Sequence, residues 1–176
     1  AVYGYGQTAA NIPPELVAIF AAEEKPIYNP EENRPQDVGS ERLIVLEDVF
    51  QNNVAPPELV FRFAEGQVMA SDETVLREGI RIVRSGGDDL FGNDSDVIVD
   101  YGWIGIGERT NEVIARFGEP LPDDLYRVYL IGDPADLGLP EILQGRTQTL
   151  INAAGLPFHN GENLEPIQFD LDLGAK

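Results

Sequence analysis

Hydrophobic and polar positions alternate along several short runs of the sequence, and this pattern predicts β-strands. The clearest run is residues 167–173, where Ile, Phe, Leu and Leu alternate with Gln, Asp and Asp. Residues 59–63 and 80–83 alternate in a similar way, with Arg62 and Arg81 on the polar side. Successive side chains of a strand point to opposite faces, so each run predicts a strand with one buried face.

Other apolar runs predict the remaining strands, which we expect at residues 15–20, 43–46, 58–63, 96–101, 112–117 and 125–131. A short strand or a bulge is expected at residues 103–106, between glycines. Residues 71–77 predict a single helical turn with Ser71 as its N-cap. Residues 133–163 are rich in Gly, Pro and Asn and predict a long loop.

These elements predict an all-β protein, an antiparallel β-sandwich of about seven to nine strands with one short helical turn. A parallel α/β fold would need crossover helices, and the sequence does not show their periodicity. A length of 176 residues corresponds to about one domain. We expect an extended N-terminal arm at residues 1–12 and one sandwich domain at residues 13–176.

The composition limits the kinds of molecule to which the protein is expected to bind. The chain has 12 Lys and Arg residues against 31 Asp and Glu residues, which gives a net charge of −19. Such a charge repels nucleic acid backbones and anionic membrane surfaces. No run approaches the roughly 18 apolar residues of a membrane-spanning helix. We therefore expect no nucleic acid partner and no membrane insertion. The absence of cysteine excludes disulfides, thiolate metal sites and cysteine nucleophiles.

Residues suited to catalysis are sparse. The chain has one histidine, His159, and no Gly-x-Ser-x-Gly elbow, Walker loop or His-Glu-x-x-His motif. The adjacent carboxylates Asp123 and Asp124 could suit glycoside hydrolysis, but neighbouring residues point apart. A turn in which they accept backbone N–H bonds is the favoured interpretation. A lone His159 is a poor metal site, and a local hydrogen bond in its loop is expected. We therefore expect that the protein is not an enzyme.

The loop at residues 86–96 (GGDDLFGNDSD) predicts a calcium site. Its candidate ligands are Asp88, Asp89, Asn93, Asp94 and Asp96. Calcium takes six to eight oxygen ligands from carboxylates, amides and carbonyls on a flexible loop. The stretch also resembles one turn of an RTX nonapeptide repeat, although RTX binding needs stacked turns. The alternative is a plain Asp, Asn and Gly hairpin loop. Structural Ca²⁺ is the one cofactor that the sequence suggests.

Aromatic residues provide two further candidate sites. Trp103, among glycines, could stack against a sugar ring, or it could be a core or sheet-corner residue. Tyr3 and Tyr5 alternate with glycines in the arm, a pattern that suits an extended segment pairing with an exposed strand edge of a neighbouring copy. The alternative for the arm is a linker. Asp170 and Asp172 share one face of the last expected strand and indicate a solvent-facing or edge position.

Several stretches taken together carry a family resemblance: NVAPPELVFRFAEGQ, GIRIVRSGGDDLFGNDSDV, NEVIARFGEPLPDDLYRVYLIG, GLPFHNG and FDLDLGA. With them, the chain resembles the Ig-like modules of very large cell-surface and secreted proteins of planctomycete-type bacteria. Those modules are similar to the Ig-like domains of bacterial S-layer and adhesin proteins. The resemblance implies an Ig-like sandwich in an exported, often multi-domain protein, and it assigns no catalytic residue.

The sequence thus predicts a non-catalytic structural module outside the cell or on its surface, in a surface layer, an adhesin stalk or a fibre. Its expected partners are neighbouring copies or tandem Ig-like modules. The alternative is a module that binds a carbohydrate or another surface ligand, and Trp103 is the residue that would distinguish it.

Overall fold

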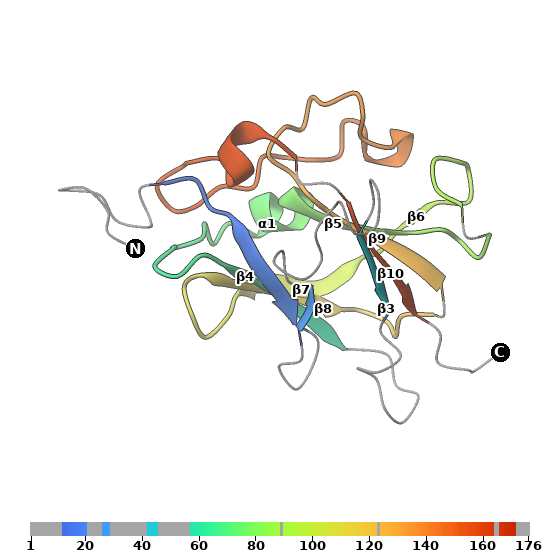
Figure 1. Cartoon of the computed structure of the whole chain (residues 1–176), viewed down its shortest axis with the longest axis horizontal. Coiled ribbons are helices and arrows are strands. Elements are labelled where there is room, and N and C mark those ends of the chain that lie inside the picture. The colour runs from blue at the N-terminus through green and yellow to red at the C-terminus, as the bar shows by residue number, and fades with distance from the viewer. Residues whose placement is uncertain are drawn as a thin grey trace.

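The computed structural model of the chain describes residues 12–20, 26–28, 42–45, 57–88, 90–122, 124–163 and 166–171. These residues form two five-stranded sheets that face each other (Figure 1). The strand order is β2-β1-β4-β8-β7 in the first sheet and β3-β10-β9-β5-β6 in the second. The predicted all-β sandwich is therefore confirmed, with more strands than the expected seven to nine.

The strands and helices have the following bounds. The first sheet contains β1 (Leu16–Phe20), β2 (Pro26–Tyr28), β4 (Glu58–Phe63), β7 (Tyr101–Ile106) and β8 (Glu112–Phe117). The second contains β3 (Arg42–Val45), β5 (Ile80–Arg84), β6 (Val97–Ile98), β9 (Asp124–Leu130) and β10 (Ile167–Leu171). A short helix, α1 (Glu73–Gly79), precedes β5, and 3-10 turns occupy Glu141–Leu143 and Phe158–Gly161. All these strand pairs are antiparallel except β3 with β10, which is parallel.

Two local predictions need correction. The strand expected at residues 96–101 is divided, because β6 ends at Ile98 in the second sheet and β7 begins at Tyr101 in the first. The chain crosses between the sheets at this point. The helical turn is present, but its N-cap is Asp72 and not Ser71. The Asp72 carboxylate accepts hydrogen bonds from the backbone of Thr74 and Val75, where the positive end of the helix favours an anion.

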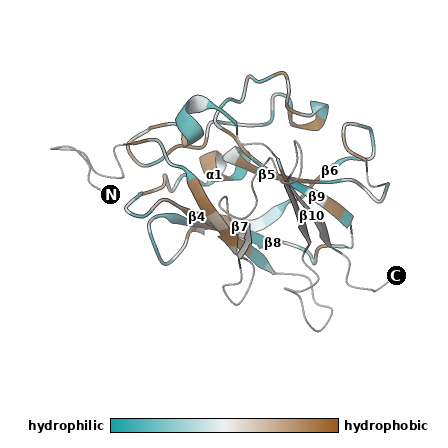
Figure 2. Cartoon of the chain, viewed as in Figure 1, coloured by the Kyte–Doolittle hydropathy of each residue, from teal (hydrophilic) through white to brown (hydrophobic). Residues whose placement is uncertain are grey.

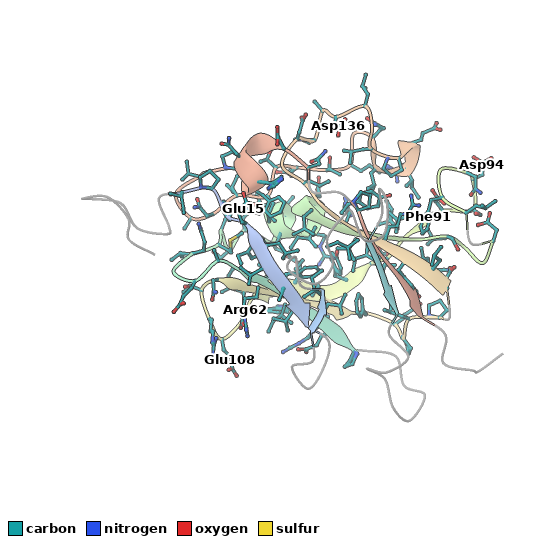
Figure 3. All side chains as sticks on the ribbon, viewed as in Figure 1. Glu15, Arg62, Phe91, Asp94, Glu108 and Asp136 are labelled. Carbon is teal, nitrogen blue, oxygen red and sulfur yellow. The ribbon has the colours of Figure 1, made fainter. Side chains whose placement is uncertain are left out.

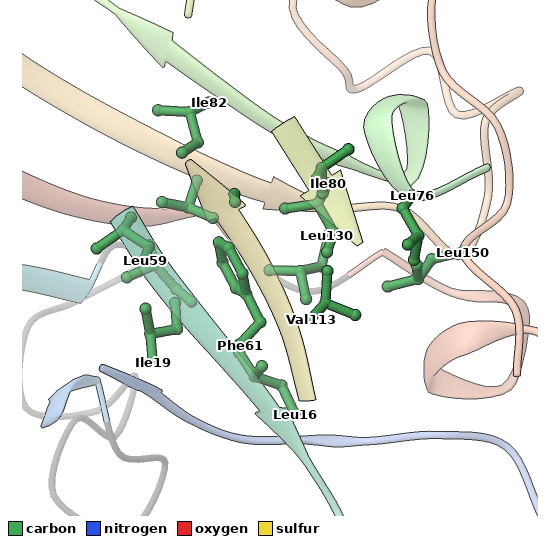
Figure 4. Packing of buried hydrophobic residues seen from close by; sticks show 14 of the residues in the cluster. Leu16, Ile19, Leu59, Phe61, Leu76, Ile80, Ile82, Val113, Leu130 and Leu150 are labelled. Carbon is green, nitrogen blue, oxygen red and sulfur yellow. The ribbon is translucent and has the colours of Figure 1, made fainter. Parts of the chain in front are cut away.

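The core lies between the sheets and follows the predicted alternation. Leu59, Phe61 and Phe63 of β4 are fully buried, and they belong to one cluster with Ile80 and Ile82 of β5 (Figure 4). Brown, hydrophobic stretches lie along the strands, whereas many loop positions are teal (Figure 2). Burial of a large apolar side chain contributes roughly 1.5–3 kcal/mol, so this shared face holds the two sheets together.

The loop at residues 133–163 covers the outer face of the second sheet and adds a second cluster. Val83 and Tyr129 point away from the main core and pack with Ile131, Leu139 and Leu143. In Figure 1 this orange segment runs above β5 and β9. The loop was predicted, but Leu139 and Leu143 of it form a second layer of packing on the sheet, and its Leu150 and Phe158 belong to the main core.

Hydrogen bonds fix this loop to the end of β9. The amide oxygen of Asn163 accepts bonds from the backbone of Gly132 and Asp133, at 2.8 Å each, and its nitrogen donates to the Asp133 carbonyl. Gly132 lies so close to the returning chain that a Cβ there would be 2.1 Å from the Glu162 carbonyl oxygen and 2.4 Å from that of Phe158. Only glycine fits at this contact.

Substitution of Gly132 by alanine should therefore destabilise the protein by about 1–3 kcal/mol, because backbone atoms must move to admit the methyl group. Urea unfolding measures the change. Gly118→Ala is the matched control, since a Cβ at Gly118 would make its nearest contact at an ordinary 3.6 Å. Equal stability of the two variants would show that the loop is not held against the sheet as described.

Candidate functional sites

The chain enters and leaves the sandwich at opposite ends. β1 starts where Leu16 pairs with Phe63, and the Phe63 amide bonds to Asn111 just before β8 begins. β10 finishes where Leu171 pairs with Asp124, which follows the turn at the far end of β8. In Figure 1 the blue strand accordingly starts at the upper left and the red strand ends at the lower right. The strand register therefore places the start of β1 at Leu16 and the end of β10 at Leu171 at opposite ends of the sandwich. We call these two places the connection points.

A buried amide pair holds the entry point. Gln67 and Asn152 are fully buried, and their side-chain nitrogens donate to the Ile12 carbonyl at 2.8 and 3.2 Å. Asn152 also donates to the side-chain oxygen of Gln67 at 3.1 Å. Buried amides are costly to leave without partners, so the Ile12 carbonyl is an integral part of this network. Sequence reasoning missed both residues, although a polar residue inside an apolar stretch was the available signal.

A second contact holds the next residues of the entry segment. The His159 amide donates to the Pro14 carbonyl at 3.0 Å, and the His159 ring nitrogen Nδ1 lies 2.6 Å from a carboxylate oxygen of Glu15 (labelled in Figure 3). The expected hydrogen bond within the histidine's own loop is present, since the His159 carbonyl accepts from the Glu162 amide at 3.1 Å. The ring, however, contacts Glu15, which is 144 residues away in the sequence. His159 thus connects the loop at residues 133–163, here called the late loop, to the segment that leads into β1.

The exit strand lies inside its sheet. β10 pairs with β3 on one side and with β9 on the other. Of the two alternatives given for Asp170 and Asp172, the edge position is therefore wrong for Asp170, since a strand with two neighbours has no free edge. The solvent-facing alternative stays a prediction. The side chain of Asp170 and the whole of Asp172 lie outside the described residues.

Asp124 is a structural acceptor at the exit end. Its side chain is 1 % exposed. It accepts bonds from the hydroxyl of Ser85, from Arg84 at 3.1 Å, and from the amides of Gly86 and Leu125 at 3.0 and 2.7 Å. Burial alone would raise the pKa of Asp124, but these bonds outweigh it and hold the pKa below its usual range. This agrees with the interpretation that Asp124 accepts backbone N–H bonds. Its partner in the proposed pair, Asp123, lies outside the described residues.

The candidate calcium loop is organised by its own hydrogen bonds. One Asp88 oxygen accepts from the Leu90 amide, and the other lies 2.8 Å from the Asn93 side-chain nitrogen and 2.7 Å from the Ser95 hydroxyl. The bond from Ser95 is the main cause that lowers the pKa of Asp88, so this carboxyl stays ionised in mildly acidic solution. Asp94 lies at the exposed tip of the loop (Figure 3).

Asp96 is the most buried of the described candidate ligands, at 9 % exposure. One of its oxygens accepts from the Gly92 amide, and the other is buried with no hydrogen-bond partner. Asp89 lies outside the described residues. Within the residues that the structure describes, no three histidine or carboxylate side chains gather closely enough to hold a metal ion. Calcium binding stays a prediction.

Trp103 lies on the surface and not in the core. It is 42 % exposed and stands opposite Arg116 of β8, at an irregular point in the pairing of β7 with β8. The Arg116 guanidinium carbon is 5.1 Å from the centre of the indole ring, and Arg116 also bonds to Glu58 at 3.2 Å. The structure therefore presents an aromatic ring beside a charged pair on the outer face of the first sheet. Tyr3 and Tyr5 lie outside the described residues.

Comparisons with known proteins find solved structures with a similar fold. No protein-family model and no curated protein matches the chain. Among solved structures, it is similar to PcoC, a methionine-rich copper resistance protein from Escherichia coli, with a TM-score of 0.46 and 14 % identity over 91 % of this chain and 99 % of PcoC.

It is also similar to domains 1–6 of the surface layer protein SbsC, with a TM-score of 0.44 and 11 % identity. That match covers 93 % of this chain and 14 % of the SbsC structure. Similarity at this level carries no argument about function. In the described part of the chain, no helix has the length and apolar character needed to cross a bilayer.

Replacing Asp124 by asparagine should cost about 1.5–3 kcal/mol at neutral pH, the usual contribution of hydrogen bonds to a charged group. The pKa of Asp124 is lower in the folded state than the roughly 3.9 of an unfolded chain, so its contribution is complete well above pH 4. It is lost as the pH falls through the folded-state pKa. Urea unfolding at pH 7 and pH 3 should therefore show a smaller difference between wild type and variant at pH 3.

The exposed Asp94→Asn is the control for that comparison and should change stability little at either pH. An Asp124→Asn penalty that is the same at both pH values would contradict a carboxylate held ionised by its partners.

Calcium binding to the loop at residues 86–96 predicts a higher melting temperature in millimolar calcium than in a chelator. A ligand that binds only the folded state, at about 100 times its dissociation constant, adds ~2.7 kcal/mol of stability. Asp96→Asn should abolish the shift, whereas Asp100→Asn, outside the loop, should keep it. Magnesium at equal concentration controls for screening of the acidic surface. Coincident melting curves in calcium and chelator would leave the loop a plain turn.

Proposed function

We propose that this chain is a non-catalytic, load-bearing module of an extracellular or cell-surface structural protein, joined end to end with further modules. The observation that carries the proposal is the path of the chain. Its entry and exit lie at opposite ends of the sandwich, as the pairing of Leu16 with Phe63 and of Leu171 with Asp124 requires. Modules connected at opposite ends form an extended row, whereas entry and exit at the same end would fold neighbours back on each other.

The strands next to both connections support this function. β1 pairs with β2 and β4, and β10 pairs with β3 and β9, so each has hydrogen-bonded neighbours on both sides. A pull along the row would load these ladders along the strands, where the backbone hydrogen bonds share the force. The amide pair at Ile12 and the contacts of His159 would carry force from the entry segment into the body of the module.

The surface charge supports an exposed role. A net charge of −19 keeps a chain soluble and repels copies of itself from side-by-side association. A row of such modules would stay extended and hydrated, and its contacts would be restricted to the ends or to specific sites.

Small-angle X-ray scattering of one, two and four copies joined in tandem tests the proposal. We expect the maximum dimension to increase by a constant amount with each copy, because every copy adds its long axis to the row. Circular dichroism of the single, double and fourfold proteins checks that all copies fold. A four-copy protein no longer than the two-copy protein would rule out an end-to-end module.

The second candidate function is carbohydrate binding at Trp103. The exposed indole ring favours it, since the apolar face of a sugar can stack on the ring while hydroxyl groups bond to Arg116 and Glu58. A glycan array tests it, and binding should be lost with Trp103→Ala. Val17→Ala is the matched control, because Val17 is a similarly exposed apolar residue of the first sheet, at 41 %. An array without any bound glycan would remove this candidate.

A further inference from the structure

The outer edge of β7 is open over its second half. β7 is the last strand of the first sheet, and β8 is its neighbour. The Gly107 amide bonds to the Glu112 carbonyl, so the alternation of an antiparallel ladder makes Gly105 and Trp103 the next residues that bond to β8. The N–H and C=O groups of Ile104 and Ile106 therefore point away from the sheet. Among the described residues, no strand lies on that side to pair with them.

Helix α1 packs against β7, and the rest of this edge has little protection. Soluble proteins usually protect an exposed edge with charged residues, prolines or bulges. At the start of β7, the register is irregular between Tyr101 and Trp103, and Arg77 of α1 donates to the Tyr101 carbonyl at 2.8 Å. From Trp103 to Ile106 the strand has no charged residue and no proline. An edge of this kind accepts a further strand.

An apolar groove of 610 Å³ lies at the Ile106 end of the same edge. Val68–Asp72 form one wall, Ile106 and Thr110 form another, and Ala153 contributes from the late loop. Val68 is 38 % exposed, although it is a large apolar residue. The groove would receive a side chain of an added strand next to Ile106, while the backbone of that strand bonds to Ile104 and Ile106.

The entry point of the chain lies next to this groove. The Ile12 carbonyl bonds to Gln67 and Asn152, which directly precede Val68 and Ala153 of the groove walls. Residues 1–11 stand before Ile12, and in extended form they span at most about 36–40 Å. They are also uncharged, since the first charged side chain of this acidic protein is that of Glu15. The segment can therefore approach the groove without repulsion from an added charge.

We propose that the segment at residues 1–11 adds to the first sheet as a strand along the open edge of β7 in its own module. Tethering beside the groove gives the segment an effective concentration in the millimolar range, well above that of a separate copy in dilute solution. The segment runs toward Ile12 at the entry end, and β7 runs toward the same end. The added strand is therefore parallel to β7, as β3 is to β10. This contact would fix the direction in which the chain arrives at the module.

Hydrogen exchange of individual amides by NMR tests the inference on the whole chain. In the full chain, the Ile104 and Ile106 amides should exchange on the order of tenfold more slowly than in a chain that starts at Ile12. The Gly105 and Gly107 amides bond to β8 and should be equally protected in both, which makes them internal controls. The deletion removes no described residue of the core, so the shortened chain retains the packing that holds the fold.

A chain in which a Gly-Ser segment of equal length replaces residues 1–11 is the matched variant, and it should behave like the shortened chain. Equal exchange of Ile104 and Ile106 in all three chains would overturn the proposal. Protection that rises with protein concentration, together with dimers in light scattering, would assign the edge to the arm of a neighbouring copy and overturn the assignment to the chain's own segment. These results do not depend on whether modules are arranged in a row, so they leave the proposed function to its own test.

Discussion

Burial of one face of each sheet against the other is the constraint on which the rest of this structure depends. The core is built from positions that alternate along β4, β5 and β9, and it allows one register for each strand, because a shift by one residue would exchange buried and exposed faces. Once the register is fixed, the places where the chain enters, crosses between sheets and leaves are fixed as well. The positions of the connecting loops follow from the packing of the sheets.

Buried polar side chains fix the segments that connect the strands. Where the chain crosses or returns, its backbone needs partners, and buried side chains supply them. Asp124 accepts a hydrogen bond from the backbone after β5, and Asn163 accepts one from the backbone after β9. Gln67 and Asn152 both donate to the Ile12 carbonyl. Each of these side chains connects segments that are distant in the sequence. They convert two packed sheets into one body with defined connection points.

The sequence predicted those parts of the fold that depend on local pattern. Strict alternation identified β4, β5 and β10, and the turn residues around Pro122 separated β8 from β9. It did not predict the break between β6 and β7, because the run at residues 96–101 is apolar throughout its middle and the change of sheet depends on neighbours that are distant in the sequence. The second cluster under the late loop was missed for the same reason: Leu139 and Leu143 show no period and are buried only because Val83 and Tyr129 face outward.

Of the candidate sites, too, the sequence predicted only those that depend on residues close together in the chain. The acidic loop at residues 86–96 was visible in the sequence because its candidate ligands are close together in the chain. The exposure of Trp103 was not, since an aromatic residue among glycines suits either a core or a surface. The sequence offered a signal for the buried amides Gln67 and Asn152, but not for their contact with Ile12, because the three residues come from separate parts of the chain.

In the proposed module, force applied between the start of β1 and the end of β10 would be carried by strands with hydrogen-bonded neighbours on both sides. Single-molecule pulling with attachments at residues 12 and 171 measures this directly. The reference geometry attaches the same protein at residues 12 and 108, which both lie at the entry end (Glu108 is labelled in Figure 3). At equal pulling speed, we expect a higher unfolding force for the end-to-end geometry. An end-to-end force equal to or below that of the reference geometry would contradict this expectation.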